Sequence, residues 1–168
     1  MGAISADAIL ECSRTTGTGQ QVGTEVRLPG LRGIAWAEGD IRPGIVFYTV
    51  QPDGTLQALW NAQTDPKCRN GLGTGKAIRQ DAGQGVAGHY HITYSHPDGK
   101  ELPALALELK QEQGTRYTLF WRTLEEKVLQ FEGVGVWMEQ KKMLVAVWWM
   151  PPREKLSLEV FVDPSPAA

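Results

Sequence analysis

The chain has 168 residues, of which 42% are hydrophobic and 21% charged, a composition that fits one globular domain with a sizeable core. Its 17 Lys and Arg residues against 19 Asp and Glu residues give a formal net charge of −2, which provides no general attraction to nucleic acid or to an anionic membrane surface. We therefore expect one domain over residues 1–163, followed by a disordered tail at 164–168, and no nucleic-acid partner.

The first dozen residues carry no basic residue ahead of an apolar run, so they do not resemble a secretory signal. The expected location is therefore the cytoplasm, unless a leader has been trimmed from the chain. Residues 3–13 show a helical pattern, with Ser5 as a candidate N-cap ahead of Ile9 and Leu10. This pattern predicts a short N-terminal helix.

Further along the chain, apolar side chains recur at every second position, which is the period of a half-buried strand. Turn sequences separate these segments: QPDG at 51–54 and HPDG at 96–99 each combine a proline that fixes φ with a glycine that accepts a left-handed conformation. Strands and turns that alternate every 8–12 residues or so are typical of sandwiches and barrels. We predict an all-β fold, an antiparallel closed or nearly closed β-barrel of about ten short strands, because closure removes exposed edges.

The longest nearly uncharged apolar stretch, residues 143–150, is far shorter than the roughly 20 residues that a membrane-spanning helix needs. No membrane span is therefore expected. Cys12 and Cys68 are the only cysteines and have no CxxC spacing for zinc or redox chemistry. Two free thiols in a reducing compartment are one interpretation, and a single bridge between them is the other.

His89 and His91 are the sharpest chemical feature, because residues two apart in a strand point to the same side and two such imidazoles can share a metal. His96 is a candidate third ligand. Against a metal site, Tyr90 and its alternate neighbours form the apolar face of this strand and leave His89 and His91 on the polar face. We therefore expect solvent-facing histidines, no metal, no cofactor and no catalytic residue.

The six tryptophans, together with several tyrosines and phenylalanines, are a large number of aromatic side chains for strands of this kind. Core packing is one interpretation. The other is a cup lined by rings that holds an apolar or planar small molecule, as barrels of about eight strands can. The candidate ligand-binding residues are Trp36, Trp60, Tyr90, Tyr117, Trp121 and Trp137. Trp148 and Trp149 must point to opposite faces, and the outward ring is a candidate for a subunit contact in a homo-oligomer.

Four segments carry a family resemblance: residues 88–99 (GHYHITYSHPDG), 117–121 (YTLFW), 131–135 (FEGVG) and 144–148 (LVAVW). Together with the strands before them, they resemble a group of uncharacterised bacterial β-rich proteins, over most of residues 20–150. The pattern is also similar to calycin barrels of the lipocalin and avidin type. Because these residues are mainly turn glycines and core aromatics, the resemblance implies a barrel and assigns no catalytic residue.

Three functions fit these observations. The first is a soluble barrel protein that binds a small hydrophobic or aromatic ligand, which the surplus of tryptophan in a closed sheet favours. The second is a structural or protein-interaction module with a filled interior. The third is a barrel-pocket isomerase or cyclase, with His89 and His91 as the available proton-transfer groups.

Overall fold

The computed structural model describes residues 8–17, 19–38, 43–62, 66–68, 71–83, 85–151 and 156–163. These residues form an all-β fold of twelve strands with two short 3₁₀ turns, η1 (Pro66–Cys68) and η2 (Glu139–Lys141). The strands are β1 (Ala8–Thr16), β2 (Gly19–Leu28), β3 (Leu31–Glu38), β4 (Gly44–Val50), β5 (Leu56–Ala62), β6 (Gly73–Arg79), β7 (Gly88–Ser95), β8 (Leu105–Gln113), β9 (Arg116–Thr123), β10 (Leu129–Met138), β11 (Met143–Trp149) and β12 (Leu156–Val162).

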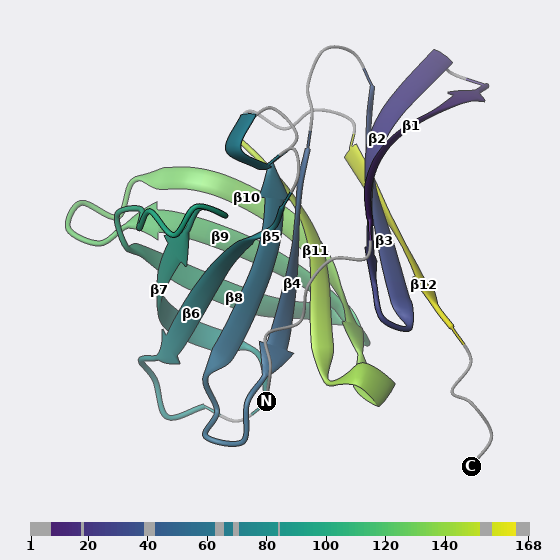
Figure 1. Ribbon diagram of the computed structural model, residues 1–168. Coiled ribbons are helices and arrows are strands. Elements are labelled where there is room, and N and C mark those ends of the chain that lie inside the picture. The colour runs from purple at the N-terminus through teal and green to yellow at the C-terminus, as the bar shows by residue number, and fades with distance from the viewer. Residues whose placement is uncertain are drawn as a thin grey trace.

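Eight strands close into an antiparallel barrel in the order β10-β11-β4-β5-β6-β7-β8-β9 (Figure 1). The predicted closed antiparallel barrel is confirmed, but it has eight strands in place of about ten. Two of its hairpin turns have the predicted chemistry. The amide of Gly54 donates to the carbonyl of Gln51 at 2.9 Å, and the amide of Gly99 donates to the carbonyl of His96 at 2.8 Å. Both glycines have positive φ, +86° and +90°, which side chains rarely adopt.

The other four strands form a separate sheet in the order β1-β2-β3-β12, which lies beside β4 and β11 of the barrel (Figure 1). The predicted N-terminal helix is wrong, because Ala8–Thr16 pairs with β2 along its whole length. The part of that prediction at residues 3–7 lies outside the described residues, as does the tail at 164–168. A neighbouring strand thus overrides a weak local helical pattern, since pairing satisfies the same backbone groups.

Two barrel strands, β4 and β11, are apolar on both faces because each separates two cores. Their inward residues, such as Tyr48 and Leu144, belong to the barrel interior. Their outward residues, such as Phe47 and Val145, pack against the small sheet. This explains the continuous apolar sequences GIVFYTV and MLVAVWW, in which alternation of polarity is lost. Trp149, the outward ring considered for a subunit contact, is 4% exposed and is covered within the chain by the small sheet.

One end of the barrel is closed by the segment between β6 and β7. Val86 of this segment is 8% exposed and packs in the barrel core. The Arg79 guanidinium holds the segment in place by donating to the carbonyls of Gly85 and Ala87, each at 2.6 Å. The Tyr90 hydroxyl adds a third bond, donated to the carbonyl of Val86 at 2.7 Å. We call this end the closed end and the opposite end the mouth.

The carboxylate of Asp81 fixes Arg79 and the start of β7. It accepts hydrogen bonds from the His89 amide at 2.8 Å, from Arg79 Nε at 2.8 Å and from the Gly83 amide at 3.2 Å. These bonds, that from the His89 amide above all, hold the pKa of Asp81 well below its usual range.

We expect the Asp81 carboxylate to make the free energy of unfolding fall at low pH. Above about pH 4, the usual carboxyl pKa, Asp81 is charged in both states and its bonds stabilise the folded chain. As the pH falls further, the unfolded chain takes up the proton first, so this contribution is lost. The Asp81→Asn variant should be less stable than the wild type at pH 7, and its loss of stability below pH 4 should be shallower. Urea unfolding between pH 7 and pH 2.5 measures both, and an equally steep loss below pH 4 in the variant and the wild type would contradict this role of Asp81.

Candidate functional site: the cavity at the barrel mouth

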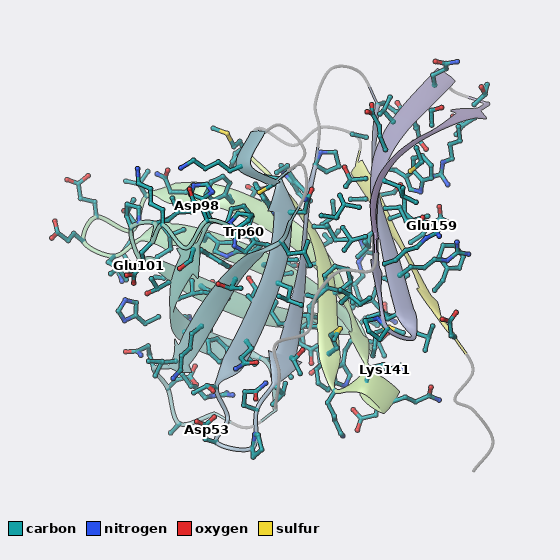
Figure 2. All side chains as sticks on the ribbon, in the orientation of Figure 1. Asp53, Trp60, Asp98, Glu101, Lys141 and Glu159 are labelled. Carbon is teal, nitrogen blue, oxygen red and sulfur yellow. The ribbon has the colours of Figure 1, made fainter. Side chains whose placement is uncertain are left out.

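The mouth opens into a cavity of about 760 Å³. Trp60 and Asp98 lie toward this end of the barrel, whereas Asp53 lies at the closed end (Figure 2). The lining comes from seven barrel strands, all but β6, and from the connections β7–β8 and β9–β10. The lining residues are Val46, Trp60, Tyr94, Leu102, Pro103, Ala104, Leu105, Trp121, Thr123, Leu124, Glu125, Glu126, Gln130, Phe131 and Trp148. The barrel is therefore filled toward its closed end and hollow toward its mouth.

Four of the lining rings lie directly over glycines of neighbouring strands. A Cβ atom built on Gly44 would lie 1.8 Å from Cε2 of Trp148, and one built on Gly73 would lie 2.1 Å from Cε2 of Trp60. The same arrangement places the ring of Tyr94 over Gly75 and that of Trp121 over Gly133. Because glycine has no side chain, each ring lies close against the backbone of the barrel wall. The large side chains thus line the wall and leave the centre of the mouth free.

Two of these rings meet at one oxygen atom. Trp121 Nε1 donates to the Tyr94 hydroxyl at 2.8 Å, and the Tyr94 hydroxyl also forms a hydrogen bond with the hydroxyl of Tyr48. Tyr48 is fully buried beneath the cavity. Burial raises the pKa of both phenols, so each keeps its proton at neutral pH. The cavity wall therefore contains one small polar cluster within an apolar surface.

The rim of the cavity is polar on the side of the β9–β10 turn. Glu125 and Glu126 line the cavity from this turn, beside Thr123 and Gln130. The described lining contains no Lys, Arg or His. A negatively charged ligand would therefore meet carboxylates and no basic partner, which disfavours it electrostatically.

The structure separates the six predicted ligand-binding residues into three groups. Trp60 and Trp121 line the mouth cavity. Tyr90 and Tyr117 point into the barrel but belong to its packed part, where they are 1% and 6% exposed. Trp137, also directed to the barrel core, lies toward the closed end, where its Nε1 donates to Glu139 at 2.5 Å.

Trp36 lies outside the barrel, contrary to its predicted place in a ring-lined cup. It belongs to β3 of the small sheet, where its Nε1 donates to Glu159 at 2.6 Å. The guanidinium of Arg14 covers its ring, 4.1 Å from the centroid. The sequence-based prediction placed all strands in one barrel, because a strand of the small sheet shows the same alternation of apolar and polar side chains as a strand of the barrel.

The histidines do not meet at the cavity. His89 lies on the outer wall, with 64% of its side chain exposed, and its Nδ1 is 3.2 Å from the Asp81 carboxylate. His91 is also exposed, whereas His96 packs beside Trp60, with ring centroids 5.6 Å apart. In the described part of the chain, no group of three or more His, Cys, Asp or Glu is arranged to hold a metal ion.

The two cysteines are both free thiols, so the alternative of a bridge between them is not formed. Cys68 is buried in η1, beside the barrel core. Cys12 lies in β1 of the small sheet, and burial, followed by the charge of Glu25, raises the pKa of its thiol. Neither cysteine lines the cavity.

Sequence reasoning missed Tyr94, Phe131 and Trp148 as lining residues. The signal for Tyr94 was present, because it shares the inward face of β7 with Tyr90. What distinguishes the two is their height in the barrel: Tyr94 lies near the mouth and Tyr90 near the closed end. Height depends on how neighbouring strands are paired, and alternation within one strand does not reveal it.

Comparisons of the chain with protein-family models, with curated proteins and with solved structures found no match. The resemblance to calycin-type barrels therefore stays a prediction. No helix in the described ranges is long and apolar enough to cross a membrane.

Proposed function

We propose that this protein binds a small hydrophobic or aromatic molecule in the cavity at the barrel mouth. The observation that supports this proposal is the cavity of about 760 Å³ with rings along its wall. Ligand sites commonly measure about 300–1,000 Å³ and are lined mainly by apolar and aromatic side chains with a few polar groups. The aromatic wall, with the Tyr94 hydroxyl as its polar group, has this character.

The two other functions receive less support. Trp60 and Trp148 do make edge-to-face contacts, with Tyr94 and Phe131 respectively. Both indoles and that of Trp121 nevertheless border open space, which a module with a filled interior would not leave. A barrel-pocket isomerase or cyclase would need proton-transfer groups that face the cavity, and His89 and His91 are on the outer wall. Glu125 and Glu126 are the acidic groups at the rim, and no basic group accompanies them in the described lining.

Equilibrium dialysis with benzophenone and diphenylmethane tests the binding proposal, because both probes are apolar and small enough for the cavity. We expect saturable binding at one site. The Leu105→Trp variant, which places an indole in the cavity, should weaken binding at least about tenfold. The matched control is Ile78→Trp on the outer wall, where Ile78 is 49% exposed, and it should leave binding unchanged.

Irradiation of bound benzophenone adds a test of position, since its excited carbonyl inserts into nearby C–H bonds. Mass spectrometry should find the label on cavity residues such as Leu102 and Leu105. Absence of saturable binding for both probes, or equal binding by the Leu105→Trp variant, would contradict the proposal.

A further inference from the structure

The polar cluster in the aromatic wall consists of the hydroxyls of Tyr48 and Tyr94 and the indole N–H of Trp121. The hydrogen atoms that these groups can donate can be counted. Tyr48 and Tyr94 are both protonated, so each hydroxyl brings one hydrogen and can accept two hydrogen bonds. Trp121 Nε1 is a donor only, and its 2.8 Å bond to Tyr94 occupies one of the two acceptor positions on the Tyr94 oxygen. The direction of the bond between the two phenols then decides what Tyr94 offers to the cavity.

Burial of Tyr48 fixes that direction. Tyr48 is 0% exposed, and the described side chains that reach its hydroxyl are those of Tyr94 and Trp121. Because the indole N–H of Trp121 can only donate, the Tyr94 oxygen is the acceptor available to the Tyr48 hydrogen. If Tyr94 donated to Tyr48, the hydrogen of Tyr48 would be buried without an acceptor, which is rare and unfavourable in folded proteins. Tyr48 therefore donates to Tyr94, and both acceptor positions of the Tyr94 oxygen are occupied.

The hydrogen of Tyr94 is then left over. Its oxygen lies where Tyr94 meets Trp121, and both residues line the cavity. The described protein atoms around this oxygen supply two donors and no further acceptor, so the cavity is the side from which an acceptor can reach the hydrogen. A hydroxyl that accepts two hydrogen bonds is polarised and becomes a better donor.

We propose that the Tyr94 hydroxyl donates a hydrogen bond to the ligand, so that the preferred ligand is an apolar molecule with an uncharged acceptor such as a carbonyl or ether oxygen. This inference rests on the proposed binding function and names the chemical class of its ligand. An anionic acceptor is disfavoured, because Glu125 and Glu126 line the rim and the described lining holds no basic side chain.

Benzophenone and diphenylmethane differ in one group, a carbonyl against a methylene, so the ratio of their affinities reports on a bond to that carbonyl. In the Tyr94→Phe variant this ratio should fall about 2- to 12-fold relative to the wild type, the range for one neutral hydrogen bond. The infrared carbonyl stretch of bound benzophenone should lie at lower frequency in the wild type than in the variant. Using the ratio cancels any general effect of the variant on the cavity.

The Tyr48→Phe variant is the matched control, and it decides the direction of the bond between the phenols. If Tyr48 donates, its removal leaves the Tyr94 hydrogen in the cavity, and the affinity ratio stays within about twofold of the wild type. If Tyr94 donates to Tyr48 instead, Tyr48→Phe releases the Tyr94 hydrogen and the ratio rises, which overturns the inference. The control also serves if Tyr94→Phe does not fold.

Failure of the inference and failure of the binding function give different results. Equal ratios in the wild type and Tyr94→Phe, with both probes still bound, overturn the donor role and leave the binding site standing. Binding of neither probe overturns both proposals. A lower ratio in Tyr94→Phe, an unchanged ratio in Tyr48→Phe and a shifted carbonyl stretch support the inference.

Discussion

Replacing Trp149 with alanine is expected to lower the free energy of unfolding by about 3–5 kcal/mol. The indole is 4% exposed and lies between β11 and the small sheet, in the same cluster as Val26 and Leu28. Its removal leaves a void between two sheets whose backbones are each held by strand pairing, so little of the void can be filled by relaxation. Urea unfolding at pH 7, followed by circular dichroism, measures the change.

Phe161→Ala is the control for this experiment. Phe161 also belongs to the small sheet but is 38% exposed. Its replacement should cost less than about 1 kcal/mol, as is usual for exposed positions. If the two variants lose similar stability, the small sheet does not bury Trp149 against the barrel in the way described.

Adding a single methyl group at Gly44 or Gly73 is expected to affect ligand binding strongly. In each case the new Cβ would overlap an indole, that of Trp148 or that of Trp60, at distances that no real contact shows. The backbone of the barrel wall holds one side of the ring, so the ring must move toward the open cavity. Gly44→Ala and Gly73→Ala should each weaken benzophenone binding at least about tenfold. The free energy of unfolding should fall by about 1–3 kcal/mol, as for other overpacked sites.

A second substitution separates a blocked cavity from general damage to the fold. In the double variant Gly73→Ala with Trp60→Leu, the smaller side chain leaves room for the added methyl group, so stability should recover relative to Gly73→Ala alone. Gly17→Ala is the control, because a Cβ there meets no atom within 4 Å. Unchanged binding in both glycine variants would show that the rings can move without entering the cavity.

Much of the barrel is predictable from local sequence. The strand 88–95 alternates between inward Tyr90, Ile92 and Tyr94 and outward histidines, as its sequence indicates. The two PDG turns mark hairpins because proline fixes φ at one turn position and glycine accepts the positive φ that another position requires. These features depend on a few neighbouring residues, and so one sequence suffices to find them.

Other features depend on which distant strands meet. The second sheet could not be recognised, because the alternation in β2 and β3 is the same whether the apolar face covers a barrel or lines it. The N-terminal segment was assigned to a helix from its local pattern, whereas pairing with β2 decides its structure. The position of the cavity depends on strand register and on the segment with Val86 that fills the opposite end, and neither is visible in the spacing of aromatic residues.

The two-faced burial of β11 has a consequence for how its alignment is chosen during folding. In a strand with one solvent-exposed face, a shift of the register by one residue exposes apolar side chains to water, and this free-energy penalty maintains the register. A register shift of β11 would expose little apolar surface, since both of its faces pack in apolar cores. Instead, size discriminates: a shift by one would put Val147 where Ala146 now faces Val46, and Trp148 where Val147 now faces Ile45. The order of small and bulky side chains along this strand therefore performs the task that alternating polarity performs elsewhere.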